Sequence, residues 1–489
     1  MEYSTQKAEA FIQANTGSVN PLFRPHLHMA APIGWINDPN GFSYYQGQYH
    51  MFCQYYPYQA IWGPMHWGHW TSPDLMNWTW RGVALAPDSP FDNLGCFSGT
   101  VLVKDETMYL MYTGVHKNSR GIVVQEQCLA TSKDGLTFEK HPANPVITSA
   151  HLPAGSDMVD FRDPKLMPHG DGYRVLLASR GEHSGLLLSY LSQDMVHWTY
   201  EGVFADGISL MPECPDYFHL DGKDIVVTCL MNQPPEGLKY QNDHHAVVYI
   251  LGDEMAGRFI PQEHHSIDLG QDFYAPQTLL TPDGRHVMIG WMQMWGEAPP
   301  THYLKHNWQG LYTFPRQLSL RDGKLCQQPI EEIAALYERE VTMHNQQVEG
   351  TLSLPGVEGS PSSLQVELTN MKQGKADIHL MQQGEMFALL RYDAASGVLS
   401  LDRSRLYYPV LALPGQEAHD VAAVQLEKGL SSLRLDILLD TCSIEVFAQD
   451  GAAALTSLAF PKEGSAGIRF AGEYTVKELT FQTLKRAAE

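Results

Sequence analysis

Short apolar segments recur through the first two thirds of the chain, and a polar turn rich in Gly and Asp precedes most of them. They combine Val, Ile, Leu, Met and aromatic residues, a composition typical of strands. Five such strands are expected, at residues 49–54, 108–112, 173–178, 224–229 and 286–291. An opening segment lies 13 or 14 residues before a central position of each strand. The pattern therefore predicts five copies of one β-hairpin.

A second pattern repeats with a fixed period. Ser72, Ser132 and Ser192 each stand two residues before an aspartate and six before an aromatic residue, at steps of 60 residues. Long periods built from short strands are typical of propellers and solenoids. Residues 31–336 have room for five copies, which predicts five four-stranded blades around an axis. The alternative, five unrelated hairpins, does not account for the 60-residue steps.

The pattern changes after residue 336. Apolar and polar positions alternate in segments such as 364–368, 387–392 and 443–448, with Gly, Asp and Pro between them. Such alternation over many short strands is typical of a β-sandwich. The predicted fold class is all-β, a five-bladed β-propeller followed by a C-terminal β-sandwich. The expected parts are an N-terminal extension at 1–30, the propeller at 31–336, a linker at 337–350, the sandwich at 351–489, and a short helix at 331–340.

Composition narrows the classes of partner. The 33 basic and 55 acidic residues among 489 leave a net charge of −22, which disfavours nucleic acid and anionic membranes. No apolar run reaches 18 residues and the first 30 residues are polar, so no membrane span or leader is expected. Seven scattered cysteines favour a reducing, cytoplasmic location over a disulfide framework. The sequence leaves open whether the chain forms a homo-oligomer.

Three of the five opening segments carry an acid at the same position: Asp38, Asp163 and Glu213. If these segments are the innermost strands, the three carboxyl groups face one central channel. Asp38 lies in a turn held by Pro39 and Gly41, which makes that turn tight and rigid. Several carboxyl groups converging on one point are the equipment of glycoside cleavage.

The neighbours of two of these acids suggest different protonation. Arg162 and Lys165 flank Asp163 and should keep it ionised. Glu213 stands among apolar residues and near Asp216, and both surroundings would raise its pKa. One charged and one protonated carboxyl group is the usual division of labour between the two acids of a glycosidase.

Other chemistries have weaker support. His66 and His69 lack the partners of a zinc site, so structural or surface histidines are the favoured interpretation. Cys214 beside Glu213 could be a nucleophile, but a buried structural cysteine is favoured because no histidine stands nearby in the sequence. Neither a phosphate-binding glycine loop nor a serine elbow is present.

The acids sit in longer stretches that resemble a known family. The chain resembles the β-fructofuranosidases of glycoside hydrolase family 32, which include invertases, sucrose-6-phosphate hydrolases and fructan hydrolases. The matching stretches are residues 35–41, 52–57, 62–69, 97–99, 161–165, 213–215, 273–277, 290–292 and 443–447. Together they cover nearly the whole chain beyond the first ~20 residues, and their joint order is specific although each alone is weak. The family fold is a five-bladed propeller with a β-sandwich.

The resemblance implies a role for each acid. Asp38 corresponds to the nucleophile, Glu213 to the general acid and base, and Asp163 to the residue that binds fructosyl hydroxyls and stabilises the transition state. It implies a fructosyl pocket made by Trp35, Ile36, Asn37, Gln54, Trp62, Phe97, Ser98, Arg162, Tyr274 and Trp291. The implied reaction proceeds with retained configuration, and since carboxyl groups fill all three roles, neither a cofactor nor a metal is expected.

The resemblance leaves the substrate open among sucrose, sucrose 6-phosphate and short fructooligosaccharides. Tyr55 and Tyr56 replace a histidine pair frequent in the family, and Ile36 replaces a methionine; the two tyrosines could alter the leaving-group side. A phosphate subsite would need basic residues at the pocket rim, and the candidates are Lys117, Arg120, His302, Lys305 and His306. Two alternatives remain: a related propeller glycosidase acting on arabinosides or xylosides, and a sugar-binding propeller without catalysis.

Overall fold

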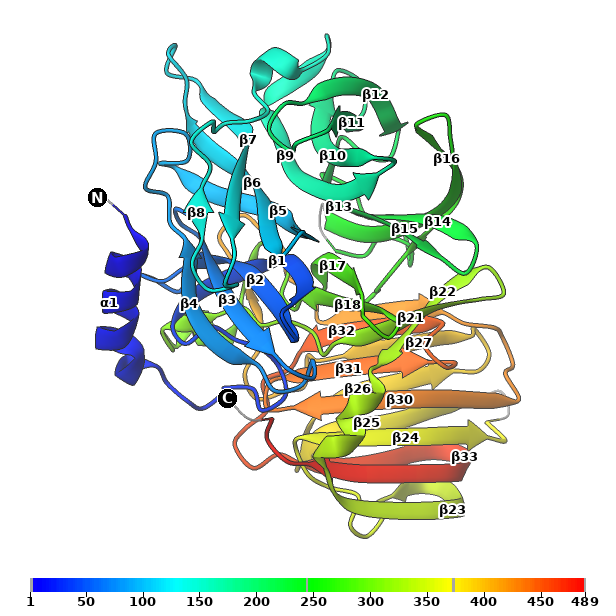
Figure 1. Ribbon diagram of the computed structural model, residues 1–489. Helices are drawn as coiled ribbons and strands as arrows, with labels where there is room; N and C mark the ends of the chain where they lie inside the picture. Colours follow the sequence, from blue (N-terminus) through cyan, green and yellow to red (C-terminus); the bar gives the residue numbers. More distant parts are fainter. Residues whose placement is uncertain (1–2, 243–244, 372–373, 488–489) are drawn as a thin grey trace.

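The computed structural model describes residues 3–242, 245–371 and 374–487. Strands dominate it, and they form two bodies that lie side by side (Figure 1). The first body is a ring of five sheets and the second is a sandwich built on one large sheet. The predicted all-β class, with a five-bladed propeller followed by a β-sandwich, is confirmed.

Each blade has four antiparallel strands in sequence order. Blade 1 holds β1 (Gly34–Tyr45), β2 (Gln48–Tyr56), β3 (His66–Ser72) and β4 (Thr79–Leu85). Blade 2 holds β5 (Gly95–Lys104), β6 (Thr107–Lys117), β7 (Val123–Ser132) and β8 (Glu139–Lys140). Blade 3 holds β9 (Ser156–His169), β10 (Gly172–Gly181), β11 (Leu186–Ser192) and β12 (Thr199–Asp206). Blade 4 holds β13 (Met211–Leu220), β14 (Lys223–Met231), β15 (His245–Met255) and β16 (Arg258–Ser266).

Blade 5 is interrupted and helps to close the ring. It holds β17 (Tyr274–Leu280), β18 (His286–Trp291), β21 (Arg316–Arg321) and β22 (Lys324–Pro329). The segment between β18 and β21 contains β19 (Glu297–Ala298), α2 (Pro300–Tyr303) and β20 (Trp308–Gln309). Strand β20 adds to β1 in parallel, so a late segment of the propeller completes its first sheet. The first strands of successive blades pack against one another, and β17 packs on β1, which makes them the innermost strands.

The 60-residue period has a local physical cause. In three blades the turn between the last two strands is held by an aspartate whose Oδ1 accepts two backbone N–H groups. Asp74 accepts from Met76 and Asn77 at 3.0 and 2.8 Å, and Asp194 makes the equivalent pair of bonds. The residue after each aspartate has left-handed backbone, with φ of 65° at Leu75 and 70° at Gly135. The repeat is therefore one turn, built three times.

The sandwich begins earlier than expected. Residues 337–350, predicted as a linker, form most of β23 (Tyr337–Leu352), which pairs along its length with β33 (Gly467–Leu484). The linker prediction is wrong because β23 is an edge strand: nearly all of its side chains are exposed or half-buried and only Val348 is buried, so its composition resembles a loop. The predicted helix is a 3-10 turn over Glu331–Leu336 that leads straight into the strand.

The other sandwich strands are short and antiparallel. They are β24 (Ser362–Thr369), β25 (Lys375–Gln383), β26 (Met386–Asp393), β27 (Val398–Asp402), β29 (Val421–Gln425), β30 (Ser432–Asp440), β31 (Ser443–Ala448) and β32 (Ala453–Leu458), while β28 (Leu411–Ala412) pairs with β19 in a separate two-stranded sheet. The long strand β33 pairs with β23, β24 and β25, so it joins the two halves of the sheet. Alternate side chains of these strands fill a separate apolar core, as the period-two pattern requires.

The N-terminal extension is ordered against the propeller. Helix α1 (Thr5–Asn15) starts at Ser4, whose side chain accepts from the N–H of Lys7 at 3.2 Å. The pattern did not predict this helix, because it buries only Ala8 and Ile12. Its Glu9 carboxylate accepts from the N–H of Val83 on β4 at 2.5 Å. A 3-10 turn, Thr16–Ser18, follows it, and a second lies at Ser149–His151.

The propeller and the sandwich meet through buried ion pairs. Arg316 on β21 donates to Glu445 on β31 and to Asp268, with Nη1 2.8 Å from Asp268 Oδ2. His28, on the segment between α1 and β1, bonds Asp440 through Nδ1 at 2.7 Å and Glu445 through Nε2 at 2.8 Å. All seven cysteines are free. Among the described residues, no helix is long and apolar enough to cross a membrane.

Candidate active site

The first strand of every blade has a β-bulge at the same level. Register shifts fall between Ile36 and Pro39 on β1 and between Phe97 and Gly99 on β5, and the other three first strands have the same irregularity. Asp38 and Asp163 lie inside their bulges, and Glu213 lies immediately before its own. A bulge turns a side chain out of the regular alternation. The five bulges therefore aim side chains into the centre of the ring.

The three acids line one cavity. Its volume is about 380 Å³, a size that suits a small sugar. The described residues on its wall are Asn37, Asp38, Gln54, Trp62, Phe97, Ser98, Gln125, Asp160, Arg162, Asp163, Glu213, Met231, His245 and Trp295. Asp38, Asp163 and Glu213, which are far apart in the sequence, thus share one site.

Asp38 is held by donors on both oxygens. The Ser98 hydroxyl donates to Oδ2 at 2.6 Å, and the Asn37 amide donates to Oδ1 at 3.0 Å. The indole N–H of Trp35 donates to the Asn37 carbonyl oxygen at 2.8 Å, which turns the amide N–H toward Asp38. Burial raises the pKa of Asp38, and the bonds from Ser98 and Asn37 only partly offset this effect.

Glu213 is clamped by a cation and a phenol. Arg162 Nη2 donates to its Oε1 at 2.7 Å, and the Tyr274 hydroxyl donates to its Oε2 at 2.6 Å. Asp216 was expected to stand beside Glu213 and raise its pKa. Instead it lies beyond the bulge and forms an ion pair with Lys165 on blade 3. The two bonds fix the orientation of the Glu213 carboxyl group at the cavity wall.

The pKa of Asp163 differs from the prediction. Burial raises its pKa to about 7, and Arg162, whose Nε lies 3.8 Å from Oδ2, lowers it only in part. The expectation that Arg162 and Lys165 keep Asp163 ionised is wrong for two reasons. Lys165 pairs with Asp216, and Arg162 divides its charge among three carboxylates. The backbone N–H of Cys214 donates to Asp163 Oδ2 at 2.9 Å.

Cys214 links two of the acids. Its thiol donates to Asp38 Oδ2 at 3.4 Å, while its N–H holds Asp163. A hydrogen bond with the thiol of Cys229, together with burial, raises the pKa of Cys214 well above the ordinary value, so the group stays a thiol. That state fits the structural interpretation of Cys214 and disfavours a nucleophilic one. The φ of 47° at Cys214 is what lets one residue reach both carboxyl groups.

Six of the ten predicted pocket residues line the cavity: Asn37, Gln54, Trp62, Phe97, Ser98 and Arg162. The other four, Trp35, Ile36, Tyr274 and Trp291, are buried behind the wall. Trp35 and Trp291 pack against Trp295, with ring centroids 6.0 and 5.0 Å away, and Trp295 itself faces the cavity. Trp62 is exposed at the rim and stands edge-on to Phe97.

Sequence reasoning missed five wall residues: Gln125, Asp160, Met231, His245 and Trp295. They come from second and third strands, from bulge neighbours and from the insertion after β18, where the hairpin repeat carries no marker. Asp160 had a usable signal, since it stands three residues before Asp163 on the same strand. The other four had none at the level of spacing.

The remaining candidates lie elsewhere. None of the basic residues Lys117, Arg120, His302, Lys305 and His306 is among the described residues on the cavity wall. His306 is buried and stacks on Phe23. Tyr55 donates its hydroxyl to the carbonyl of Ile33, so it also stays away from the cavity. Within the described part of the chain, no group of three or more His, Cys, Asp or Glu side chains could hold a metal ion.

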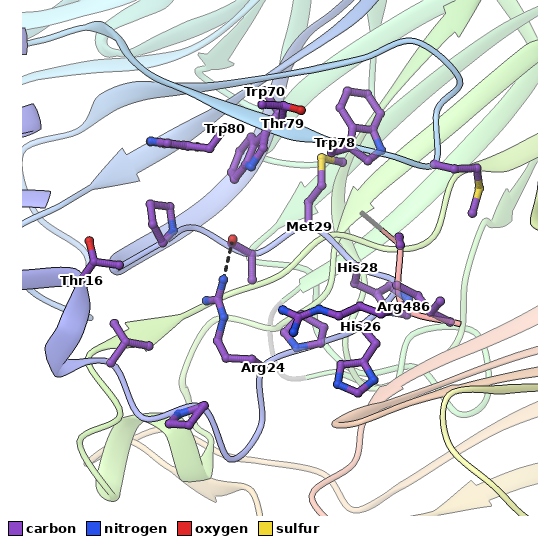
Figure 2. A pocket seen from close by; sticks show the side chains of 18 residues that line it. Thr16, Arg24, His26, His28, Met29, Trp70, Trp78, Thr79, Trp80 and Arg486 are labelled. Atoms are coloured by element: carbon purple, nitrogen blue, oxygen red, sulfur yellow. Dashed lines mark hydrogen bonds between the residues drawn. The ribbon is translucent and has the colours of Figure 1, made fainter. Parts of the chain in front are cut away.

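A larger cavity, of about 520 Å³, lies where residues 16–32 cross blade 1 and meet the C-terminal segment (Figure 2). Trp70, Trp78 and Trp80 form one side of it, and Arg24, His26 and His28 the other. Arg24 Nη2 donates to the carbonyl of Ala30 at 3.1 Å inside it. None of the three repeat acids lines this cavity. The cavity that holds the three acids is therefore the smaller of these two cavities.

Comparison with known proteins agrees with this geometry. The glycosyl hydrolases family 32 N-terminal domain matches residues 28–329, and the family 32 C-terminal domain matches residues 332–485. A sucrose-6-phosphate hydrolase of Escherichia coli is 34% identical over 94% of this chain and 93% of its own length. A raffinose invertase of Escherichia coli is 36% identical over 90% of each.

Solved structures show the same architecture. A variant of a Bombyx mori β-fructofuranosidase, in complex with sucrose, superposes with a TM-score of 0.85 at 30% identity and covers 99% of both chains. A sucrose-6-phosphate hydrolase from Lactobacillus gasseri gives a TM-score of 0.86 at 25% identity, with 99% of this chain and 100% of that chain covered. Family models that together match residues 28–329 and 332–485, with relatives of this similarity, leave one assignment: the chain belongs to glycosyl hydrolases family 32.

Proposed function

We propose that this chain is a β-fructofuranosidase that hydrolyses terminal β-D-fructofuranosyl residues from sucrose, sucrose 6-phosphate or short fructooligosaccharides. The observation that carries the proposal is the convergence of Asp38, Asp163 and Glu213 from three blades on one cavity of about 380 Å³. The relatives named sucrose-6-phosphate hydrolase and raffinose invertase support the choice of sugar. We propose a double displacement with retained configuration.

In the first step Glu213 protonates the glycosidic oxygen while Asp38 attacks the anomeric carbon. The donors on Asp38 hold it in one orientation, so little conformational freedom is lost when the fructosyl group arrives. The burial that raises its pKa also removes water, and a poorly solvated carboxylate is a better nucleophile. The bond between the anomeric carbon and the glycosidic oxygen breaks, the leaving sugar departs with the proton from Glu213 as its new hydroxyl hydrogen, and a fructosyl ester forms on Asp38.

In the second step Glu213 acts as a base toward water. Glu213 has given its proton to the leaving sugar, and Arg162 and Tyr274 still hold its carboxyl group in place to accept a proton from water. The activated water attacks the ester and fructose leaves with its original configuration. This double inversion requires the two carboxyl groups to lie about 5–5.5 Å apart.

Asp163 binds the sugar in this scheme. Its Oδ2 is held by the N–H of Cys214, and Arg162 lies beside it. A carboxyl group so placed can accept hydrogen bonds from two fructosyl hydroxyls, and these bonds strengthen as positive charge develops on the ring. Asn37, Gln54, Trp62, Phe97 and Ser98 complete the fructosyl pocket, and Trp35, Ile36, Tyr274 and Trp291 support it from behind.

The chemistry needs only a small carbohydrate partner. Carboxyl groups supply the nucleophile, the acid and the base, so the scheme uses neither a cofactor nor a metal. A cytoplasmic location stays a prediction from cysteine usage, and the seven free thiols agree with it.

The test is the stereochemistry of the first product. Sucrose is incubated with the purified chain and the fructose anomer is followed by NMR before mutarotation. We expect β-fructofuranose first, together with glucose. Release of the α-anomer would contradict the double displacement. Cleavage of aryl arabinosides or xylosides without fructose release would favour the related glycosidase, and a lack of any hydrolysis would favour a sugar-binding propeller.

A further inference from the structure

The charge around the leaving-group side of the cavity is carried by one guanidinium and two flanking acids. Arg162 Nη2 lies 2.7 Å from Glu213 Oε1, and its Nη1 lies 2.6 Å from Asp160 Oδ1. Because two terminal nitrogens of one guanidinium hold them, the carboxylates of Asp160 and Glu213 are near neighbours. Glu213 is the proposed proton donor to the leaving sugar. Asp160 therefore stands next to the place where the leaving sugar must lie.

Acids outnumber cations on this wall. Asp38, Asp160, Asp163 and Glu213 line the cavity, and among the described residues that line it Arg162 is the one arginine or lysine. His245 also lies on the wall, with its ring edge-on to Tyr274. Arg180 reaches Asp160 from behind, with Nε 2.6 Å from Oδ2, but does not line the cavity. Both guanidinium groups are thus already engaged by carboxylates.

We propose that Asp160 makes this cavity select a substrate with an uncharged leaving sugar over one that carries a phosphate. The inference rests on the proposed function and names its substrate class: sucrose and neutral sugars that extend it, not sucrose 6-phosphate. The phosphate of sucrose 6-phosphate is carried on C6 of the leaving glucose, whose C1 oxygen meets Glu213, so it would enter the part of the cavity that holds a second carboxylate, Asp160, and less water than bulk solvent. Repulsion between like charges is strong there. Recruiting Arg162 to the phosphate would take it away from Glu213.

The experiment compares kcat/KM for sucrose and sucrose 6-phosphate at pH 7.5 and low ionic strength. We expect sucrose to be preferred by tenfold or more. Adding salt to about 0.2 M should narrow the ratio, because it screens the charge of the rim. This series uses the unmodified chain, so it does not depend on the folding of any variant. A preference for sucrose 6-phosphate would overturn the proposal.

Two variants test whether Asp160 causes the preference for sucrose over sucrose 6-phosphate. Asp160→Asn should shift the ratio toward the phosphorylated sugar by threefold or more, although both rates fall because Arg162 loses a partner. Asp157→Asn is the matched control: it removes the same charge from the same strand, β9, away from the cavity wall, and should leave the ratio unchanged. Taking a ratio within one preparation cancels differences in the active fraction.

The outcomes separate this inference from the proposed function. Equal ratios for Asp160→Asn and Asp157→Asn would remove Asp160 as the selecting residue. Cleavage of sucrose 6-phosphate but not of sucrose would overturn the selection and leave the β-fructofuranosidase proposal intact. Release of fructose from neither sugar would reject the selection for sucrose, and if kestose also released none, the β-fructofuranosidase proposal would be rejected as well.

Discussion

The cavity that holds the three acids and the interface between propeller and sandwich contain the same kinds of residue, but the pKa values of their buried acids shift in opposite directions. Both bury carboxyl groups around an arginine. At the interface, burial would raise the pKa of Asp440, but the bond and charge of His28 and two backbone N–H groups outweigh it and bring the pKa to about 2. In the cavity, burial raises the pKa of Asp163 to about 7 and nothing outweighs it.

The difference lies in how many donors each acid receives. Glu445 accepts from Arg316, from Nε2 of His28 and from the N–H of Phe314, so all its bonding capacity is used and its pKa is lowered. In the cavity Arg162 is shared among three carboxylates, and of these Asp160 also pairs with Arg180. At the interface, hydrogen-bond donors fill the acceptor positions of the buried acids, which stabilises the fold. The cavity is left short of cations, and its acids keep the capacity to exchange protons and bind a sugar.

Asp38→Asn is expected to show the largest difference between an effect on activity and an effect on stability. Removing the proposed nucleophile should lower kcat/KM for sucrose by about 10⁵-fold. The melting temperature should rise slightly at neutral pH, since burial raises the pKa of Asp38 and ionising such a carboxyl group opposes folding as pH rises above its unfolded value. Steady-state kinetics and calorimetry on the same preparation measure both. Turnover within tenfold of the parent would contradict the assignment of Asp38.

The reverse behaviour is expected for Glu445→Gln. It leaves Arg316 and His28 buried beside a neutral amide, and breaking a buried pair costs about 3–5 kcal/mol. We expect a large fall in the denaturant midpoint, while kcat of the folded fraction stays near the parent value. A variant that loses activity without losing stability would show that the two regions are not separable.

The third contrast uses pH. Burial alone would lower the pKa of His28, but Asp440 and Glu445 raise it from 6.5 to about 9. Its contribution to stability is therefore complete below pH 6.5 and is lost as pH rises through 9; its size is about 3 kcal/mol. Chemical unfolding at pH 6, 8 and 10 should show the decline. In His28→Gln the decline between pH 8 and 10 should be much smaller.

The smallest effect is expected for Tyr274→Phe. The change removes one donor to Glu213 and keeps the ring buried against His245. Loss of one hydrogen bond that orients the Glu213 carboxyl group should lower kcat/KM by about tenfold, and the melting temperature should change little. A drop as large as that of Asp38→Asn would instead place Tyr274 among the groups that react with the substrate.

The sequence was informative wherever a local rule repeats. The five hairpins and the three acids could be predicted because each copy marks its opening strand, and the aspartate turn at Asp74 recurs at the same step. Edge strand β23 could not be predicted, since its exposed positions carry a loop-like composition. The prediction that Asp163 is ionised was wrong for a different reason. Lys165 stands two residues after Asp163, which on a regular strand would put both side chains on one face, but the register shift between Arg162 and Lys165 breaks that alternation and Lys165 pairs with Asp216.

The pocket shows the same limit. Gln54 could be predicted as a wall residue because a polar side chain interrupts an apolar strand. Trp295 and His245 reach the wall from an insertion and from the third strand of a blade, positions that no repeat rule marks. Which tryptophan faces the sugar and which lies behind it is a question of three-dimensional packing.

The bonds between Asp440 and the segment at residue 26 set an order of events during synthesis. The N–H groups of His26 and Leu27 donate to a carboxylate made 414 and 413 residues later. Until the ribosome has produced Asp440, the segment that leads into blade 1 lacks these bonds and is held by the propeller alone, through bonds such as that from the N–H of Tyr312 to the carbonyl of Met29. Truncation before Asp440 therefore removes contacts at the beginning of the molecule as well as at its end.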